Sequence, residues 1–407
     1  MDASFWLKGF TRVWKLRTFS VGRNTTLKCG TAWVQLPAGR SRWTMGQHPM
    51  ANLRKQLQEK GLLDKPTAKS WTKILVLLAI LAGLYTAHIA LPLKVGLVLL
   101  PITALLTTTV AMIGHEGVHS SACKSKTGNI SLAAIAFPLF SGLSMEYWRN
   151  KHNVQHHAHP NVVGRDPDIH SWPLTFTKEE YETSGKLRQF FQKYLQAYVF
   201  WPVLTPLVGH LMRYDGLKYM ITAPFKAKKN KFSKMWLLDA SLILVHFFCW
   251  LVVPVMLGLA WQLVVGFYVV LWAAVGVYLT AIFIVGHAGR PTVTEYDENW
   301  RLQIETGRRI KLGPLGSFFF VGLDYQIEHH LLPALSHFNL PKAAPIVKEY
   351  AEERGWEYEE VGLFRALWRS TVALAVAWKT PAIVIDGNSS KNANLIEDFG
   401  HHEPTEA

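Results

Sequence analysis

The chain is poor in cysteine. Its 407 residues include three, Cys29, Cys123 and Cys249, which are scattered and form no CxxC pair. This spacing excludes a disulfide framework and a metal site built from thiolates. A glycine-rich fingerprint for a flavin or a pyridine nucleotide is also missing from the sequence. Other residue types must therefore supply any reactive site.

Charged residues are scarce in four long apolar runs. These runs are residues 73–92, 93–113, 236–257 and 258–285. Each reaches the length of about 20 residues that spans the hydrocarbon core of a bilayer. A hydrophobic content of 49% and sixteen tryptophans also suit a membrane protein. The predicted fold class is an all-α membrane protein of two transmembrane hairpins. The shorter apolar run 132–143 is expected to lie along the interface or to dip and return.

Acidic residues are outnumbered, and the formal net charge is +14. The basic residues lie mainly outside the apolar runs, for example in KAKKNKFSK (226–234) and RRIK (308–311). Basic flanks of a membrane protein explain this charge without a nucleic-acid partner. The two hairpin turns carry only Lys94. The positive-inside rule therefore predicts a multi-pass protein whose remaining segments form a helical cap on the cytoplasmic side, or on the stromal side in a plastid.

The ends of the chain differ in composition from its middle. Residues 1–50 hold almost no acid after Asp2 and resemble an organellar transit peptide. A cytosolic basic arm or an upstream start codon would give the same composition. We expect a membrane domain at 51–350, an amphipathic or interfacial segment at 351–385 and a polar, disordered tail at 386–407.

Histidine is abundant and clustered. A neutral imidazole is the commonest protein ligand for a transition metal. Eight of the seventeen histidines lie just after the second apolar run, in the middle segment, or after the fourth run. They are His115, His119, His152, His156, His157, His287, His329 and His330. Helical residues four apart share a face, which predicts that His115 lies near His119 and His152 near His156. The predicted topology brings all eight to one membrane face, where they can converge.

The number of imidazoles suits two metal ions with about four ligands each and open positions for water or dioxygen. Gln326, three and four residues before His329 and His330, is placed to be a further ligand. Imidazole suits iron, zinc, copper and nickel alike, so ligand type does not name the metal. Four neighbouring carboxylates are expected to orient the rings, with solvated loop positions as the alternative: Glu116, Asp166, Asp168 and Asp324.

These motifs resemble a known family. HEGVH (115–119), HNVQHH (152–157) and QIEHH (326–330) are similar to the three histidine boxes of the membrane fatty acyl desaturases. The box that opens with Gln326 is similar to the front-end branch, which inserts a double bond between an existing one and the carboxyl end. The resemblance covers most of residues 70–345. It implies a non-haem di-iron centre, dioxygen and a membrane lipid or acyl-CoA substrate.

The sequence departs from that pattern in two ways. The family's water-mediated asparagine ligand would fall at Phe283, which cannot coordinate a metal, so Gln326 is expected to fill part of its place. The HPGG haem motif of a fused cytochrome b5 is absent, and the nearest run is HPM (48–50). An external ferredoxin or cytochrome b5 is therefore expected to supply electrons, attracted by the basic runs 226–234 and 308–311.

The substrate is expected in a narrow apolar tunnel between the second and fourth spans. Tyr147, Trp148 and Tyr325 adjoin the histidine motifs and are candidates for its wall, with interfacial anchoring as the alternative. A related hydroxylase, ketolase or acetylenase would use similar motifs. A metal transporter is the alternative from another class, although it would place its ligands near the midplane. The sequence carries no signal for the oligomeric state.

Overall fold

The computed structural model describes residues 26–29, 32–35, 50–226 and 232–386. The chain divides into two units, residues 1–51 and 52–407. In the first unit, strand β1 (Thr26–Cys29) pairs antiparallel with β2 (Ala32–Gln35). Most of the predicted basic segment 1–50, and the predicted tail apart from Asp386, lie outside the described residues.

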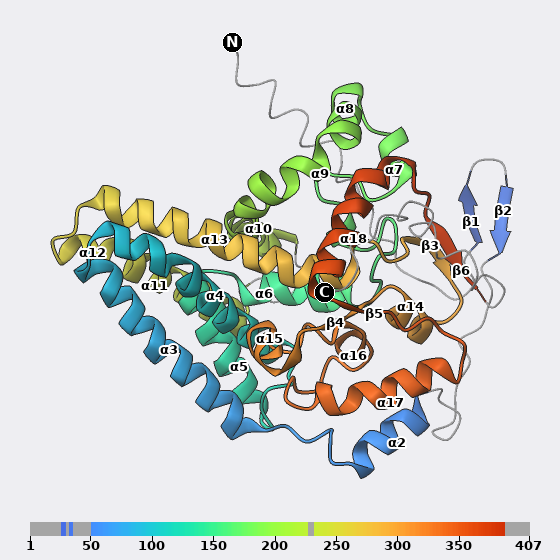
Figure 1. Ribbon diagram of the computed structural model, residues 1–407, viewed down its shortest axis with the longest axis horizontal. Helices are drawn as coiled ribbons and strands as arrows, with labels where there is room; N and C mark the ends of the chain where they lie inside the picture. Colours follow the sequence, from blue (N-terminus) through green and yellow to red (C-terminus); the bar gives the residue numbers. More distant parts are fainter. Residues whose placement is uncertain (1–25, 30–31, 36–49, 227–231, 387–407) are drawn as a thin grey trace. The chain divides into compact units, whose positions relative to one another are not determined.

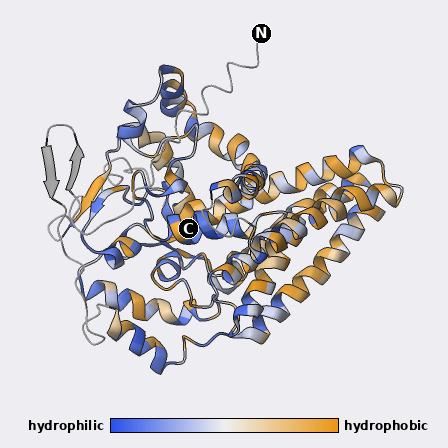
Figure 2. Ribbon diagram, turned by 180° about the vertical axis from the view of Figure 1, so that it is seen from behind, coloured by the Kyte–Doolittle hydropathy of each residue, from blue (hydrophilic) through white to orange (hydrophobic). Residues whose placement is uncertain are grey.

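In the part of the chain that the structure describes, four helices are long and apolar enough to cross a membrane. They are α3 (Thr67–Ala90), α4 (Leu93–Val118), the segment Lys234–Met256 and α13 (Trp261–His287). The third segment joins α11 (Lys234–Phe247), η5 (Phe248–Val252) and α12 (Val253–Met256). Figure 2 shows hydrophobic residues along these helices. The four apolar runs of the sequence are thus confirmed as membrane-length helices.

The chain between α4 and the second histidine motif folds back on itself. It passes through α5 (Lys126–Ala134), the π-helix η1 (Ile135–Ser141), α6 (Met145–Trp148) and the π-helix η2 (Arg149–His156). Only when taken together are its two halves long and apolar enough for a membrane span, and the helix axis bends by 113° between them. Gly142, with a φ of 64°, makes this bend in the left-handed region that favours glycine. The bend agrees with the expected dip and return.

Helix α10 (Thr205–Lys226) packs closely against α13. A Cβ atom on Gly209 would lie 2.3 Å from the carbonyl oxygen of Trp272, and one on Gly276 would lie 2.5 Å from that of Thr205. Small residues let two helix backbones approach in this way. The two glycines therefore fix α10 beside the fourth span.

The remaining elements lie near the C-terminal ends of α4 and α13 (Figure 1). In chain order, with α2 preceding α3, they are α2 (Ala51–Glu59), η3 (Pro167–Ile169), α7 (Lys178–Glu182), α8 (Lys186–Tyr194), α9 (Gln196–Val199), η4 (Phe200–Leu204), β3 (Val293–Tyr296), α14 (Asn299–Glu305), β4 (Arg309–Lys311), α15 (Gly313–Phe320), α16 (Gln326–Leu331), α17 (Leu340–Glu352), β5 (Glu360–Gly362), α18 (Leu363–Val376), η6 (Ala377–Lys379) and β6 (Ile383–Ile385). β3 pairs in parallel with β6, and β4 with β5. These pairs attach the C-terminal segment to the chain that follows α13.

A buried ion cluster strengthens the same attachment. Glu359 accepts hydrogen bonds from Arg290 at 2.7 Å, from Arg308 at 2.8 Å and from Arg369. Burial alone would raise the pKa of Glu359, but the three guanidinium groups outweigh it and hold that pKa at about 2. The cluster joins the chain after α13, the start of β4 and α18.

Candidate metal centre

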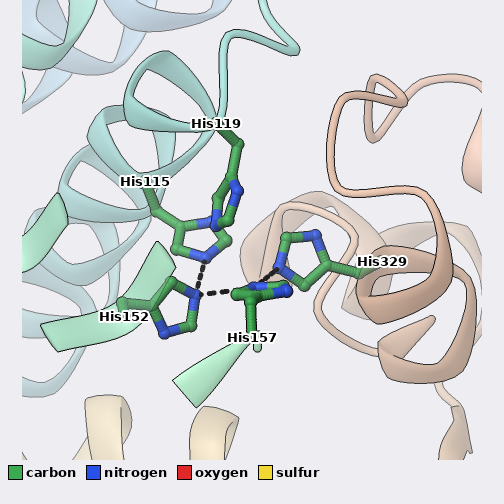
Figure 3. A group of neighbouring side chains, drawn as sticks. All are labelled: His115, His119, His152, His157 and His329. Atoms are coloured by element: carbon green, nitrogen blue, oxygen red, sulfur yellow. Dashed lines mark hydrogen bonds between the residues drawn. The ribbon is translucent and has the colours of Figure 1, made fainter. Parts of the chain in front are cut away.

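Five of the eight histidines form one group, called here the five-histidine group: His115, His119, His152, His157 and His329. One nitrogen of each ring lies within 4.8 Å of one nitrogen of every other ring, and all five residues are buried. The Nε2 atoms of His115 and His152 are 2.8 Å apart, and His157 Nε2 lies 3.1 Å from those of His152 and His329. Figure 3 shows the rings pointing toward one another from α4, η2 and α16.

The other three, His156, His287 and His330, form a second group, called here the three-histidine group. His330 Nε2 lies 3.0 Å from His287 Nε2 and 3.3 Å from His156 Nε2. The Gln326 amide nitrogen is 2.8 Å from His287 Nε2. All the histidines and the glutamine that the sequence singled out as ligands are thus brought together.

The hydrogen bonds of the three-histidine group leave its inner nitrogens without a proton. His156 Nδ1 donates to Asp166 at 3.0 Å, His287 Nδ1 to the carbonyl of Thr306 at 3.0 Å, and His330 Nδ1 to the Gln303 side-chain oxygen at 3.1 Å. A neutral imidazole carries one proton, so each Nε2 presents a bare lone pair. Lone pairs that face one another at such distances repel, and a cation between them turns this repulsion into coordination.

Two further observations agree with metal binding. His119 Nε2 and Gln326 Oε1 are buried and have no hydrogen-bond partner among the described residues, an arrangement that buried polar atoms normally avoid. An imidazole nitrogen binds a divalent ion at about 2.0–2.1 Å, so ligands on opposite sides lie about 4 Å apart. The nitrogens of each group lie within 4.8 Å of one another, which is close enough for them to share one ion. Both groups therefore fit a metal ion.

Burial keeps most of these rings in the neutral form that binds metals. It lowers the pKa of His157, His329 and His330, to about 3 for His329, and neighbouring imidazoles lower it further. His156 differs: burial lowers its pKa, but Asp166 and Asp168 outweigh this effect and raise it. A carboxylate on the outer nitrogen makes an imidazole more basic and a stronger ligand.

The π-helix η2 decides which histidine joins which group. His157 N donates to the carbonyl of His152 at 2.9 Å, a bond across five residues, so these two side chains share a face. His152 and His157 enter the five-histidine group, and His156 enters the three-histidine group. His152 also lies beside His156, as the sequence predicted: the two rings stack with centroids 5.3 Å apart, and with Asp168 they form a further group of possible ligands. With Gln326 the three-histidine group offers four side chains, and the five-histidine group offers five.

A model of the fatty acid desaturase family matches residues 92–362, which include all eight histidines. The chain belongs to the fatty acid desaturase family. It is 27% identical over 261 residues to the acyl-lipid (9-3)-desaturase of Physcomitrium patens, covering 62% of this chain and 47% of the moss protein.

Two other relatives of this desaturase-family chain are covered more fully. The sn-1 linoleoyl-lipid 6-desaturase of Synechocystis is 25% identical over 325 residues, covering 76% of this chain and 88% of the relative. The Delta(6)-fatty-acid desaturase fat-3 of Caenorhabditis elegans is 24% identical over 325 residues, covering 75% of this chain and 69% of the relative. The matched part thus spans about half of the moss protein and most of the other two.

Gln326 reaches the three-histidine group because Gly286 leaves room for it. A Cβ atom on Gly286 would lie 2.8 Å from the Gln326 side chain. Phe283, one turn before His287 on α13, packs against Trp148 and the rings of His115 and His152 instead of offering a ligand. Gln326 is therefore a polar side chain beside His287, and its role as a ligand stays a prediction.

The four carboxylates predicted to orient the rings fall into two pairs. Asp166 contacts His156, and Asp168 lies 3.5 Å from the same nitrogen and 2.7 Å from Lys151. Glu116 instead contacts Ser121 and His337, and Asp324 contacts Ser317. On α4, Glu116 is about 100° around the helix from His115, so sequence proximity did not place it beside the ligands.

Gln303 and Thr306 orient the rings, a role that the sequence had suggested for Glu116 and Asp324. The sequence pattern did not indicate either residue. Gln303 Nε2 donates to the carbonyl of His157 at 2.9 Å while its oxygen accepts from His330, so one side chain links the two groups. Thr306 acts through its backbone carbonyl, which any residue could supply. Neither position has a signal in the sequence.

A residue of the third span holds the second histidine motif in place. Asp239 of α11 is fully buried and accepts from Ser144 Oγ at 2.7 Å and from the backbone nitrogens of Met145 and Glu146 at 3.0 Å. These are free donors of the first turn of α6, and a carboxylate at this end of a helix is stabilising. The cap fixes α6, and α6 continues directly into η2.

An apolar cavity adjoins the five-histidine group. It is narrow, and its wall comes from α4, η1, α6, α10 and α13. Trp148 lines it and stacks on the ring of His152, with centroids 4.7 Å apart. Tyr147 and Tyr325 do not belong to its wall: Tyr147 contacts Tyr219, and Tyr325 lies under Arg309. Of the three candidates, Trp148 alone lines this cavity between α4 and α13, and the substrate tunnel itself stays a prediction.

The basic run RRIK (308–311) is not an open positive patch. Arg308 is 1% exposed and paired with Glu359, and Arg309 and Lys311 both pair with Glu360. The other run, 226–234, falls largely on residues 227–231, which lie outside the described residues. The predicted attraction of an acidic electron carrier by RRIK is therefore weakened by these internal ion pairs.

Proposed function

We propose that the chain is a fatty acyl desaturase that uses dioxygen and two non-haem irons to introduce a double bond into an acyl chain. One observation carries the proposal: histidines from α4, η2, α13 and α16 converge in two adjoining groups beside an apolar cavity. His115, His119, His152, His157 and His329 would hold one ion, and His156, His287, His330 and Gln326 the other. Family membership supports the same activity.

The iron pair would supply the redox chemistry. In the overall reaction two hydrogens leave adjacent methylenes of the acyl chain, and dioxygen is reduced to water. Two electrons and two protons must enter from outside to balance this reaction. We propose a separate ferredoxin or cytochrome b5 as the electron donor. The side chains of this protein keep the imidazoles neutral, orient them through Asp166, Gln303 and the Thr306 carbonyl, and surround the substrate with apolar walls.

The substrate is proposed to be an acyl chain carried on a membrane lipid or on CoA, and the reaction to be of the front-end type. The names of the moss and cyanobacterial relatives specify acyl-lipid substrates, and QIEHH resembles the front-end motif. We propose a multi-pass membrane location with the centre on the cytoplasmic or stromal face, where the ends of α4 and α13 meet.

The test is expression of the intact chain in a host that supplies ferredoxin or cytochrome b5, with mass spectrometry of total fatty acids. A new unsaturated species is expected, with its double bond mapped to the carboxyl side of an existing one. The variant His329→Ala, His330→Ala should lose it, whereas His170→Ala, an exposed histidine outside both groups, should keep it. A hydroxylated or keto lipid would indicate a related hydroxylase or ketolase. Metal uptake into vesicles without any lipid product would indicate a transporter.

A further inference from the structure

Lysines gather on the surface where α3 begins and where the chain leaves α4 for α5. Residues 60–69 and 120–130 together hold five lysines and one acidic residue, Asp64. The five lysines are called here the lysine patch: Lys60, Lys65, Lys69, Lys124 and Lys126. All are exposed except Lys65, which is half-buried. These two segments therefore present a positively charged surface.

Hydrogen bonds hold the two segments side by side. The backbone nitrogen of Lys124 donates to Thr67 Oγ1 at 3.0 Å, and Ser70 Oγ donates to the carbonyl of Ala122 at 2.9 Å. The first turn of α3 thus lies against the loop that precedes α5 (Figure 1). Because the backbones are tied together, the lysines of both segments belong to one continuous surface.

The charge of the lysine patch is not balanced by the chain itself. Among the residues that the structure describes, no carboxylate forms an ion pair with any of its five lysines. Other surface lysines do have such partners: Lys55 pairs with Glu59, Lys311 with Glu360 and Lys348 with Glu352. Like charges that lie close together repel, so this surface would gain from a partner that brings negative charge.

The lysine patch begins beside a ligand of the candidate metal centre. His119 belongs to the five-histidine group, the next residue, Ser120, is exposed, and Lys124 follows four residues later. The rate of electron tunnelling falls steeply with distance, so a carrier bound at this place would have a short route to the group. The run RRIK offers less, because Arg308, Arg309 and Lys311 are paired with acidic residues of the chain.

We propose that the lysine patch is the surface on which the electron carrier docks, and that this carrier is an acidic one-electron protein. The inference rests on the proposed function and adds the place where its partner binds. Each carrier delivers one electron, so two successive dockings supply the two electrons of the proposed reaction, whose oxidant is dioxygen. Complementary charge of this kind steers the encounter and fixes the orientation of the two proteins.

The test measures the binding of two acidic probes, a plant ferredoxin and the soluble domain of cytochrome b5, to the intact chain in nanodiscs. The lipid is phosphatidylcholine alone, which carries no net charge. At least one probe should bind wild type. Lys124→Gln, Lys126→Gln should weaken this binding by about 3–10-fold at low salt, because each lysine contributes one weak surface ion pair. The difference should disappear in roughly 1 M salt, where the Debye length is about 3 Å.

The matched control is Lys178→Gln, Lys186→Gln, which removes the same net charge from α7 and α8. Both lysines are exposed and lie far in sequence from the patch. This variant should bind the carrier as wild type does. Equal weakening in the two variants would overturn the inference, since net charge alone would then explain the effect. Failure of wild type to bind either probe would overturn it as well. So would a patch variant that keeps the carrier but loses affinity for vesicles of anionic lipid, because the patch would then face the membrane.

A product assay separates this inference from the proposed function. The patch variant should form less product when the carrier is limiting, and excess carrier should restore the wild-type rate. The KM for the carrier should therefore rise while kcat stays unchanged. A lower kcat at saturating carrier, with an unchanged KM, would contradict a docking role. Absence of lipid product from a wild-type protein that binds the carrier would instead reject the proposed function.

Discussion

Replacing Asp166 with asparagine should separate the two metal sites. Asp166 directs both carboxylate oxygens at His156 Nδ1, each at 3.0 Å, and is fully buried. Asparagine keeps the shape and one acceptor oxygen but removes the charge. A hydrogen bond to a charged group contributes roughly 1.5–3 kcal/mol, and loss of such a partner typically lowers metal affinity about 10–100-fold. We expect that loss in the three-histidine group and no loss in the five-histidine group.

The assay is iron per chain, measured by mass spectrometry of the element after dialysis against increasing chelator. At a chelator concentration where wild type keeps both ions, Asp166→Asn should keep one. The control is Asp64→Asn, because Asp64 is exposed and belongs to neither histidine group. It should release iron at nearly the wild-type concentration. An Asp166→Asn protein that keeps both ions, or loses both together, would refute the assignment of Asp166 to one group.

Three further predictions concern packing, charge and capping. Gly209→Ala should force α10 away from Trp272 and lower the free energy of unfolding by about 1–3 kcal/mol. Thermal unfolding in detergent measures this loss. The control is Gly266→Ala, where a Cβ atom meets open space, and an equal loss in that variant would contradict the prediction. The lowered pKa of Glu359 means that its stabilisation is complete above its ordinary value of 4.5 and is lost as pH falls toward about 2. This loss is worth roughly 3 kcal/mol, so denaturation by urea should show a difference between wild type and Glu359→Gln that shrinks with acid; a constant difference would argue against the ion cluster. Asp239→Ala should uncap α6 and reduce product formation more than Asp239→Asn, which retains an acceptor, and equal activities would exclude the cap.

The sequence predicted the parts of this fold that depend on long or regular patterns. The four spans follow from apolar length alone. His115 and His119, and Gln326 with His329 and His330, lie together because α4 and α16 are helices that continue through these motifs. Each of these predictions needed only the length of an apolar run or the spacing of residues along a helix, and both can be read directly from the order of the amino acids.

The remaining features depend on contacts that composition does not encode. A π-helix closes its hydrogen bonds over one residue more than an α-helix, so HNVQHH gave no sign that His157 would join His152 in the five-histidine group. Helix α10 escaped notice because polar residues such as His210 and Arg213 dilute its hydropathy, although its position depends on two glycines. Gln303 lies far in sequence from His157 and His330 and meets them only in the folded chain.

The order of the ligands along the chain sets the order in which the two metal groups can be completed during synthesis. His115, His119, His152 and His157 are made before the second hairpin, and only His329 of the five-histidine group comes later. In the three-histidine group, His287 and His330 both follow the fourth span. A ribosome that has released residue 160 has therefore delivered four of five ligands for one ion and one of three for the other. If each group holds one ion, as proposed, insertion of the third and fourth spans would be required for the second ion, and a chain arrested before them could hold at most the first.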